Sequence, residues 1–295
     1  MQQAHTSVKP RGQKPFARGY NPSANDAELT PAIGKGRSAR MSFETIQLNI
    51  SNGVAIVALN RPRALNAINK LMLHELDLVL DQIKQDERIR VVVLTGARRA
   101  FSFGADFDDL AGDSAEATKT KFVDMLPRFQ NVIRKLYDLP QPTIASLNAF
   151  AAGAGLDLAL ACDIRIAADK VKLSEAFVKM SLVPDGGGTW ALARIIGYAR
   201  AAEMIFTGEP IDATEAERIG LINRIVPAAE LEATVNTLAA QIAASPAAVI
   251  QRAKRLLRAN SSNNLDEALN NEAAAQFECV TDPEFNEMLS RRQRK

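Results

Sequence analysis

The sequence is poor in cysteine and histidine, the residues that most often build disulfides, metal centres and catalytic triads. Its 295 residues include two cysteines, Cys162 and Cys279, and two histidines, His5 and His74. No second Cys or His stands at ligand spacing, so we expect neither a disulfide framework nor a metal site, and a reducing cytoplasmic location. Because His5 lies near the N-terminus, triad chemistry would depend on His74 alone. Carboxylates and backbone amides are therefore the better candidates for catalysis.

The chain also lacks a long apolar run and a strong excess of one charge. No run approaches the ~18–20 residues of a membrane-spanning helix, so no membrane partner is expected. Residues 1–40 carry seven Lys or Arg against two acidic residues, and the remaining 255 carry 29 basic and 32 acidic residues. This near-neutral body gives no case for nucleic-acid binding. The Pro, Gly, Lys and Arg content of residues 1–40 predicts a disordered basic N-terminal extension.

From Met41 onward, short apolar strands alternate with amphipathic helices, which is typical of an α/β fold. Strands are expected at 43–48, 54–59, 91–95, 143–147 and 164–168, and helices at 68–86, 118–136, 156–161, 190–196 and 213–219. Asn66 is expected to cap the first helix, and Pro127 to break the second. Further helices are expected at 230–243, 247–259 and 265–279. The pattern predicts an α/β core over 41–227 and a helical C-terminal region over 228–295.

Three segments combine small residues with a carboxylate. Ala100–Phe107 follows a strand, Asn148–Asp157 leads through a Gly/Ala-rich turn into a helix, and Val183–Trp190 contains three glycines in a row. Free N–H groups at such a helix start favour an oxyanion. Each segment taken alone is equally well explained as a turn with a helix cap. A dinucleotide-binding motif is excluded in the second segment because Leu158 stands where the third glycine would be.

In their order and spacing these segments resemble the enoyl-CoA hydratase/isomerase (crotonase) superfamily over Met41 to about Asp282. The matching stretches are Leu59–Ala67, Phe101–Asp106, Asn148–Asp163, Pro184–Thr189 and Ala216–Val226. The resemblance implies a crotonase-type spiral of ββα units with a helical C-terminal trimerisation region. It also implies an acyl-CoA substrate, no cofactor beyond the coenzyme A of that substrate, and a homotrimer or homohexamer.

The resemblance further implies roles for individual residues. The N–H groups of Ala105 and Ala154 resemble the donors of the family's oxyanion hole, which stabilises a thioester enolate. Ala64, Leu65 and Ala67 resemble positions along the coenzyme A path. The other expected substrate contacts are Phe103, Gly104, Asp106, Phe107, Phe150, Gly153, Pro184 and Gly186. The phenylalanines among these are equally compatible with core packing.

The carboxylates distinguish between possible reactions. In the hydratase pattern two glutamates hold one water, but here their positions are taken by Asp157 and by Phe177, which cannot transfer a proton. Glu175 is displaced from the second position by two residues. Asp185, which follows Pro184, resembles the single base of the enoyl-CoA isomerase branch and of the phenylacetate-pathway isomerases. We predict double-bond isomerisation, with Asp185 as the base and Asp157 as an assisting or orienting group.

Several alternatives stay open at this point. Asp157 and Asp185 could share a water for hydration or for thioester hydrolysis. Either residue could instead have only a structural role, Asp185 as a helix cap and Asp157 as a cap or an i,i+4 partner. The chain could also be a non-catalytic binding module whose basic N-terminal segment contacts nucleic acid.

Overall fold

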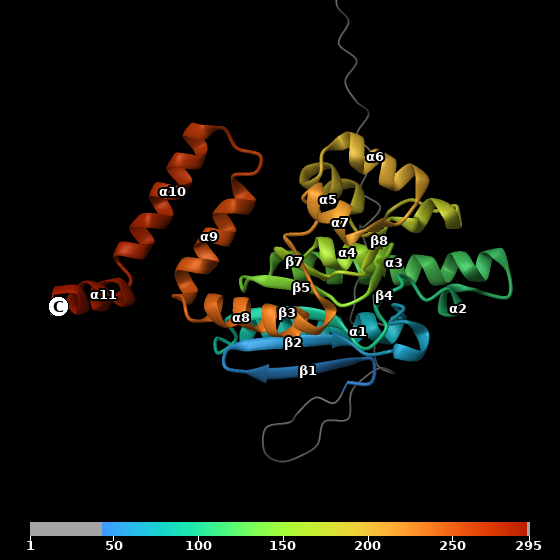
Figure 1. The fold of residues 1–295 in the computed structure, drawn as a ribbon, viewed down its shortest axis with the longest axis horizontal. Coiled ribbons are helices and arrows are strands. Elements are labelled where there is room, and N and C mark those ends of the chain that lie inside the picture. Colours follow the sequence, from blue (N-terminus) through green and yellow to red (C-terminus); the bar gives the residue numbers. More distant parts are fainter. Residues whose placement is uncertain (1–42, 294–295) are drawn as a thin grey trace, which may run out of the picture. The chain divides into compact units, whose positions relative to one another are not determined.

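The computed structural model describes residues 43–293, and within them the chain forms two β-sheets (Figure 1). The larger sheet has the strand order β1 (Ile46–Ser51), β2 (Val54–Leu59), β3 (Val91–Gly96), β5 (Thr143–Leu147), β7 (Ile164–Ala168) and β10 (Arg224–Val226). The smaller sheet has the order β4 (Ala100–Ser102), β6 (Phe150–Ala152), β8 (Lys172–Ser174) and β9 (Ile211–Asp212). The pairs β1–β2 and β8–β9 are antiparallel, and the other pairs are parallel.

Pairs of strands alternate with helices along the chain. The helices after the first three pairs are α1 (Lys70–Gln85), then α2 (Phe107–Leu110) with α3 (Ala115–Asp138), then α4 (Ala154–Leu160). The later ones are α5 (Gly188–Ile195), α6 (Tyr198–Thr207) and α7 (Ala213–Arg218). From β3 to β8, the first strand of each pair joins the larger sheet and the second joins the smaller sheet. The predicted α/β class and its repeating ββα units are therefore confirmed.

The apolar pattern located the strands of the larger sheet well. β2, β5 and β7 have the predicted bounds, β3 is one residue longer, and β1 begins at Ile46 instead of 43. Residues Val91 to Leu94 of β3 are buried, as expected for a central parallel strand. The predicted apolar face of α1 is buried as well. The strands of the smaller sheet have only two or three residues, too few to give a periodic signal.

The prediction that Asn66 caps α1 is wrong. Asn69 is the cap, and its side chain accepts a hydrogen bond from the Met72 N–H. Asn66 lies in the preceding loop with φ of 56°, a left-handed conformation that asparagine tolerates better than most residues. Its fully buried side chain bonds to backbone groups of two other segments. Asn66 therefore joins loops to one another and does not begin the helix.

The predicted break at Pro127 is also wrong, because α3 runs through it without interruption. A proline inside a helix lacks the N–H that would bond to the carbonyl four residues earlier. That earlier residue is Val123, which is 62% exposed. This turn of the helix therefore lies next to solvent, where water can replace the lost partner and the helix can continue.

The chain after β10 is helical, in agreement with the prediction. It contains α8 (Leu231–Ala243), α9 (Ala247–Ala259), α10 (Leu265–Val280) and α11 (Pro283–Gln293). No single helix within residues 43–293 has the length and apolarity of a membrane span. The segment Ala228–Ala243, which contains α8, reaches that length and apolarity only when it is combined with α9, and the two are bent by 104°. The predicted disordered extension at 1–40 lies outside the described residues.

A largely buried ionic cluster joins α9 to the central sheet. Lys254 Nζ lies 2.7 Å from Asp163 Oδ2 and donates a hydrogen bond to the Gln141 carbonyl. Arg258 reaches the other carboxylate oxygen of Asp163 at 2.7 Å. Asp163 also accepts hydrogen bonds from the N–H and hydroxyl of Thr143, the first residue of β5. One carboxylate therefore connects the C-terminal helices to the central sheet.

Candidate active site

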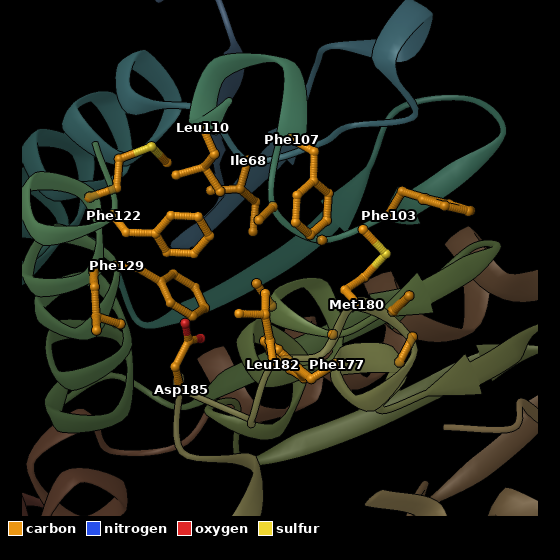
Figure 2. A pocket seen from close by; sticks show the side chains of 18 of the residues that line it. Ile68, Phe103, Phe107, Leu110, Phe122, Phe129, Phe177, Met180, Leu182 and Asp185 are labelled. Carbon is orange, nitrogen blue, oxygen red and sulfur yellow. The ribbon is translucent and has the colours of Figure 1, made fainter. Parts of the chain in front are cut away.

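A mostly apolar cavity of about 280 Å³ lies between the ends of β4 and β6, helix α3 and the segment that follows β8 (Figure 2). Six phenylalanines contribute to its wall: Phe103, Phe107, Phe122, Phe129, Phe150 and Phe177. Among the described residues that line it, only Lys179 and Asp185 are ionisable. Figure 2 shows the Asp185 carboxylate pointing into the cavity beside Phe129. The cavity therefore suits an apolar group that must meet one carboxylate.

Two backbone amides face this cavity. Ile68 donates a hydrogen bond to the Gly104 carbonyl and accepts one from the Asp106 N–H, so the intervening Ala105 N–H points away from Ile68. Ala154 is the first residue of α4, where an N–H has no partner within its helix. Both alanines line the cavity, and within residues 43–293 neither N–H donates a hydrogen bond. Two free donors at one apolar cavity can stabilise a developing oxyanion.

Gly104 allows the two amide-bearing loops to approach each other. Its φ is +95°, a region that residues with a Cβ rarely adopt. A Cβ at this position would lie 2.9 Å from the Ala152 carbonyl oxygen and 3.6 Å from the Ala154 nitrogen. A side chain at position 104 would therefore separate the Ala105 and Ala154 loops.

Asp185 has the electrostatic character of a weak base. Burial raises the pKa of Asp185 to about 6, and a hydrogen bond from its own backbone opposes this shift. The carboxylate is therefore largely ionised at neutral pH but binds a proton more tightly than an exposed aspartate. Gln130 of α3 fixes the main chain here, because its Nε2 donates to the Asp185 carbonyl at 3.1 Å.

Asp157 is fully buried on α4 behind the cavity. Burial, together with a smaller contribution from the charge of Asp185, raises its pKa to about 8, and hydrogen bonds from the Gly186 and Gly188 amides oppose the shift. The Gly186 N–H lies 3.2 Å from Asp157 Oδ2. Asp157 lines a second cavity of about 230 Å³, between α3 and α5, with Tyr137 and Trp190 in its wall.

Glu175 completes a cluster of three carboxyl groups. It follows β8 directly, is 0% exposed, and neither of its carboxylate oxygens has a hydrogen-bond partner among the described residues. Burial raises the pKa of Glu175 well above its ordinary value, and the charges of Asp157 and Asp185 add to this. A Cβ on Gly188 would lie 2.7 Å from Asp157 Oδ1 and 2.8 Å from Glu175 Oε1. Glycine at this turn therefore lets both carboxyls approach the main chain.

The comparison with known proteins identifies the family. The profile described as enoyl-CoA hydratase/isomerase matches residues 49–292. The chain belongs to the enoyl-CoA hydratase/isomerase family. A probable enoyl-CoA hydratase of Rhodobacter capsulatus is 39% identical over 247 residues, which cover 84% of this chain and 94% of the relative. A 1,2-epoxyphenylacetyl-CoA isomerase of Escherichia coli is 36% identical over 77% of this chain and 87% of its own length.

The solved structures give the same result for the fold. The crystal structure of an enoyl-CoA hydratase from Bacillus anthracis superposes with a TM-score of 0.80 at 33% identity, covering 85% of this chain and 96% of that one. The fold is the crotonase fold expected from the sequence motifs. This protein is therefore an enzyme of the hydratase/isomerase family.

Many of the residues that the family motifs indicated meet at the apolar cavity. The cavity wall includes Phe103, Gly104, Ala105, Phe107, Phe150, Gly153, Ala154 and Asp185. Phe103 and Phe107 are 54% and 40% exposed, so core packing does not explain them. Asp185 does not cap a helix either, because the N-cap residue of α5 is Gly187.

Other predicted residues lie outside this wall. Gly186 lines the second cavity with Asp157, and Pro184 lines neither cavity. Ala64 ends the short 3-10 helix Pro62–Ala64, and Leu65 and Ala67 follow it in the loop before α1. This loop adjoins the amide-bearing loop, since the Phe103 N–H donates to the Leu65 carbonyl. Asp106 caps α2 and forms an ion pair with Arg61. The cap agrees with the structural alternative for this segment, a turn with a helix cap.

Family motifs gave no role to Glu175, because the hydratase position falls on Phe177. Phe177 is in the 3-10 helix Ala176–Met180 and lies in the cavity wall, while Glu175 is directed beneath it toward Asp157. The signal that could have located Glu175 is its position directly after the short strand β8. Gly153, in the cavity wall, has the same position after β6. Strand β8 was itself too short to predict.

Proposed function

We propose that this enzyme isomerises the double bond of a 3-enoyl-CoA to the conjugated 2-enoyl-CoA. We assign the substrate's acyl group to the apolar cavity of about 280 Å³, called the acyl cavity below. The observation that carries the proposal is the placement of Asp185, the single carboxylate in the described wall of this cavity, beside the free amides of Ala105 and Ala154. A base and an oxyanion site in one apolar cavity are sufficient for enolate chemistry.

The reaction needs one base and balances without another reactant. The Asp185 carboxylate takes a proton from C2, and the electrons of the C2–H bond delocalise onto the thioester oxygen. The N–H groups of Ala105 and Ala154 donate to that oxygen while it carries the negative charge. The protonated Asp185 then delivers the proton to C4, which leaves the double bond between C2 and C3. A pKa of about 6 suits both halves of this transfer.

Phe177 supports isomerisation over water addition. It occupies the position of the second hydratase glutamate and contributes an apolar wall to the cavity. Water addition would also require Asp157 as a partner, but Asp157 is 1% exposed and lines the second cavity instead of the first. The enolate in an apolar cavity is protected from stray protonation by solvent.

Hydration of a 2-enoyl-CoA is the second candidate function. Relatives such as the Rhodobacter capsulatus and Clostridium acetobutylicum proteins carry the name enoyl-CoA hydratase. The charge of Asp185 also raises the pKa of Asp157, so the two carboxyls are close enough to interact. In this alternative both carboxyls would hold one water, one as base and one as acid.

The proposal extends to the coenzyme and the assembly. The coenzyme A portion of the substrate would lie along the loop that carries Ala64, Leu65 and Ala67, and no further cofactor would take part. The C-terminal helices would form a homotrimer or homohexamer in the cytoplasm. In support, Leu257 on α9 and Leu265 and Phe277 on α10 are each at least 70% exposed. Sedimentation of the purified chain would measure the assembly.

The decisive assay supplies the purified enzyme with a 3-enoyl-CoA and follows the absorbance of the conjugated thioester. A rise in absorbance that is lost in Asp185→Asn supports isomerisation. The matched control is Asp169→Asn, which changes an exposed carboxylate outside both cavities. Failure of the wild-type enzyme to isomerise, together with loss of absorbance from 2-enoyl-CoA, would replace this proposal with hydration.

A further inference from the structure

Arg61 connects the two loops in front of the acyl cavity. Its Nη1 donates to the Ala67 carbonyl at 2.6 Å and to Asp106 Oδ2 at 2.6 Å. The side chains of this ion pair are only 23% and 12% exposed. A partly buried, charge-assisted bond of this kind is stronger and more rigid than a surface ion pair. Neither Arg61 nor Asp106 lines the acyl cavity.

Asp106 is the residue directly after Ala105, so its anchoring fixes the peptide unit of Ala105. Asp106 Oδ1 accepts from the N–H groups of Asp108 and Asp109, and Oδ2 accepts from Arg61. Its own N–H donates to the Ile68 carbonyl at 2.9 Å. Both oxygens and the amide of Asp106 are therefore engaged within the protein. This argues against the earlier expectation that the Asp106 side chain contacts substrate.

The Arg61 end of the pair is equally fixed. The Arg61 N–H donates to Asn66 Oδ1 at 2.9 Å, and Asn66 Nδ2 donates to the carbonyls of Ala97 and Ala100. Ser102 adds a link on the other side, since its hydroxyl donates to the Asn66 carbonyl and accepts from the Gly104 N–H. The loop from 61 to 68 and the loop from 97 to 106 thus form one connected unit.

We propose that Arg61 and Asp106 are positioning residues that hold the Ala105 N–H in the direction needed to polarise the substrate carbonyl. The inference rests on the proposed oxyanion role of that amide. A hydrogen bond weakens steeply as its angle departs from linearity, and a preorganised donor must not reorient during the reaction. Arg61 supplies this restraint from outside the cavity, where it does not occupy substrate space.

Loss of the pair should affect turnover more than binding. In Asp106→Asn the helix-cap acceptor is retained but the charge that holds Arg61 is removed. We expect kcat to fall by roughly 10- to 100-fold, the scale of a displacement of about 1 Å in a catalytic group, with KM changed little. Arg61→Met should have a similar effect, and Arg61→Lys should recover part of the rate because it keeps the charge. Asp109→Asn is the matched control, since Asp109 is exposed and its side chain bonds, among the described residues, only the Lys70 N–H.

A spectroscopic measurement separates positioning from general loss of structure. A saturated acyl-CoA labelled with ¹³C at its thioester carbonyl does not react, and the infrared frequency of that carbonyl falls when oxyanion donors polarise it. We expect the wild-type enzyme and Asp109→Asn to lower the frequency, and Asp106→Asn and Arg61→Met to lose most of the shift. Thermal unfolding of each variant would be measured alongside, and if Asp106→Asn fails to fold, the two Arg61 variants decide.

The possible outcomes distinguish this inference from the proposed function. Absence of a carbonyl shift in the wild-type enzyme would refute the proposed role of the Ala105 and Ala154 amides as oxyanion donors. A wild-type shift that persists unchanged in folded Asp106→Asn and Arg61→Met, with unchanged kcat, would overturn the positioning role and leave the isomerase proposal intact. A lost shift with reduced kcat and recovery in Arg61→Lys would establish Arg61 and Asp106 as positioning residues.

Discussion

The buried carboxyls beneath the acyl cavity should make folding stability fall as pH rises. Burial raises the pKa of Asp157 to about 8 in the folded chain, whereas an unfolded aspartate titrates near 3.9. Between these values the folded state binds a proton that the unfolded state has released. The contribution to stability is therefore fully present below pH ~4 and is lost as pH rises through ~8. Glu175, whose pKa is also raised by burial, acts in the same direction.

The size of the effect follows from the width of this window. Each pH unit between the two pKa values changes the free energy of unfolding by about 1.4 kcal/mol for one group. From pH 4 to pH 7 the contribution of Asp157 alone is on the order of 4 kcal/mol. Asparagine at position 157 keeps an acceptor for the Gly186 N–H but never ionises. Asp157→Asn should therefore be close to wild type in stability at pH 4.5 and more stable by a few kcal/mol at pH 8.

Urea unfolding at several pH values between 4.5 and 8.5 would measure this difference. The protein concentration must be held constant, because association of subunits also contributes to apparent stability. Glu175→Gln should show the same trend, and Asp169→Asn, an exposed replacement of the same kind, should follow wild type. A stability difference between Asp157→Asn and wild type that is independent of pH, or that shrinks as pH rises, would refute the reasoning.

Three further results are expected. Because Asp185 must be ionised to act as a base, kcat/KM should fall about tenfold per pH unit below its pKa of about 6; a flat profile to pH 5 would exclude it as the base. Gly104→Ala should lower kcat and destabilise the fold by ~1–3 kcal/mol, since its Cβ has no room at φ +95°, and unchanged kinetics and melting would contradict this. Burial raises the pKa of Cys162 to about 12, so a thiol reagent should modify the half-buried Cys279 in the native enzyme and Cys162 only after unfolding. Rapid native labelling of both thiols would oppose that expectation.

Apolar patterning predicted the five longer strands of the larger sheet and the long helices, because each of these elements buries one or both of its faces over at least five residues. The strands of the smaller sheet escaped prediction because pairing with neighbours, and not a local pattern, holds two or three residues extended. Asn66 was misassigned for a related reason. A buried asparagine that bonds to distant loops has the same local sequence signature as a helix cap.

The residues of the candidate site likewise fall into those that sequence motifs predicted and those that only the structure shows. Motif order indicated Ala105, Ala154 and Asp185, which line one cavity in the folded chain. Glu175 and the Arg61–Asp106 pair were beyond the reach of motif reasoning, because their significance depends on residues that are distant in sequence. Only the folded chain shows which carboxylates lack partners and which are fully bonded.

The two donor amides follow neighbouring parallel strands of the smaller sheet, β4 and β6. Their positions therefore depend on strand register and main-chain geometry, and many sequences that keep the register would retain them. The positions proposed for proton-transfer groups in this family, in contrast, hold single side chains on separate segments: Asp157 on α4, Phe177 after β8, and Asp185 before α5. Under the proposed chemistry, moving a carboxylate from one of these positions to another would change which reaction the enolate undergoes, while the two donor amides would stay as they are. In such an architecture a new reaction requires few substitutions, since the main chain positions the two donor amides and only side chains must change.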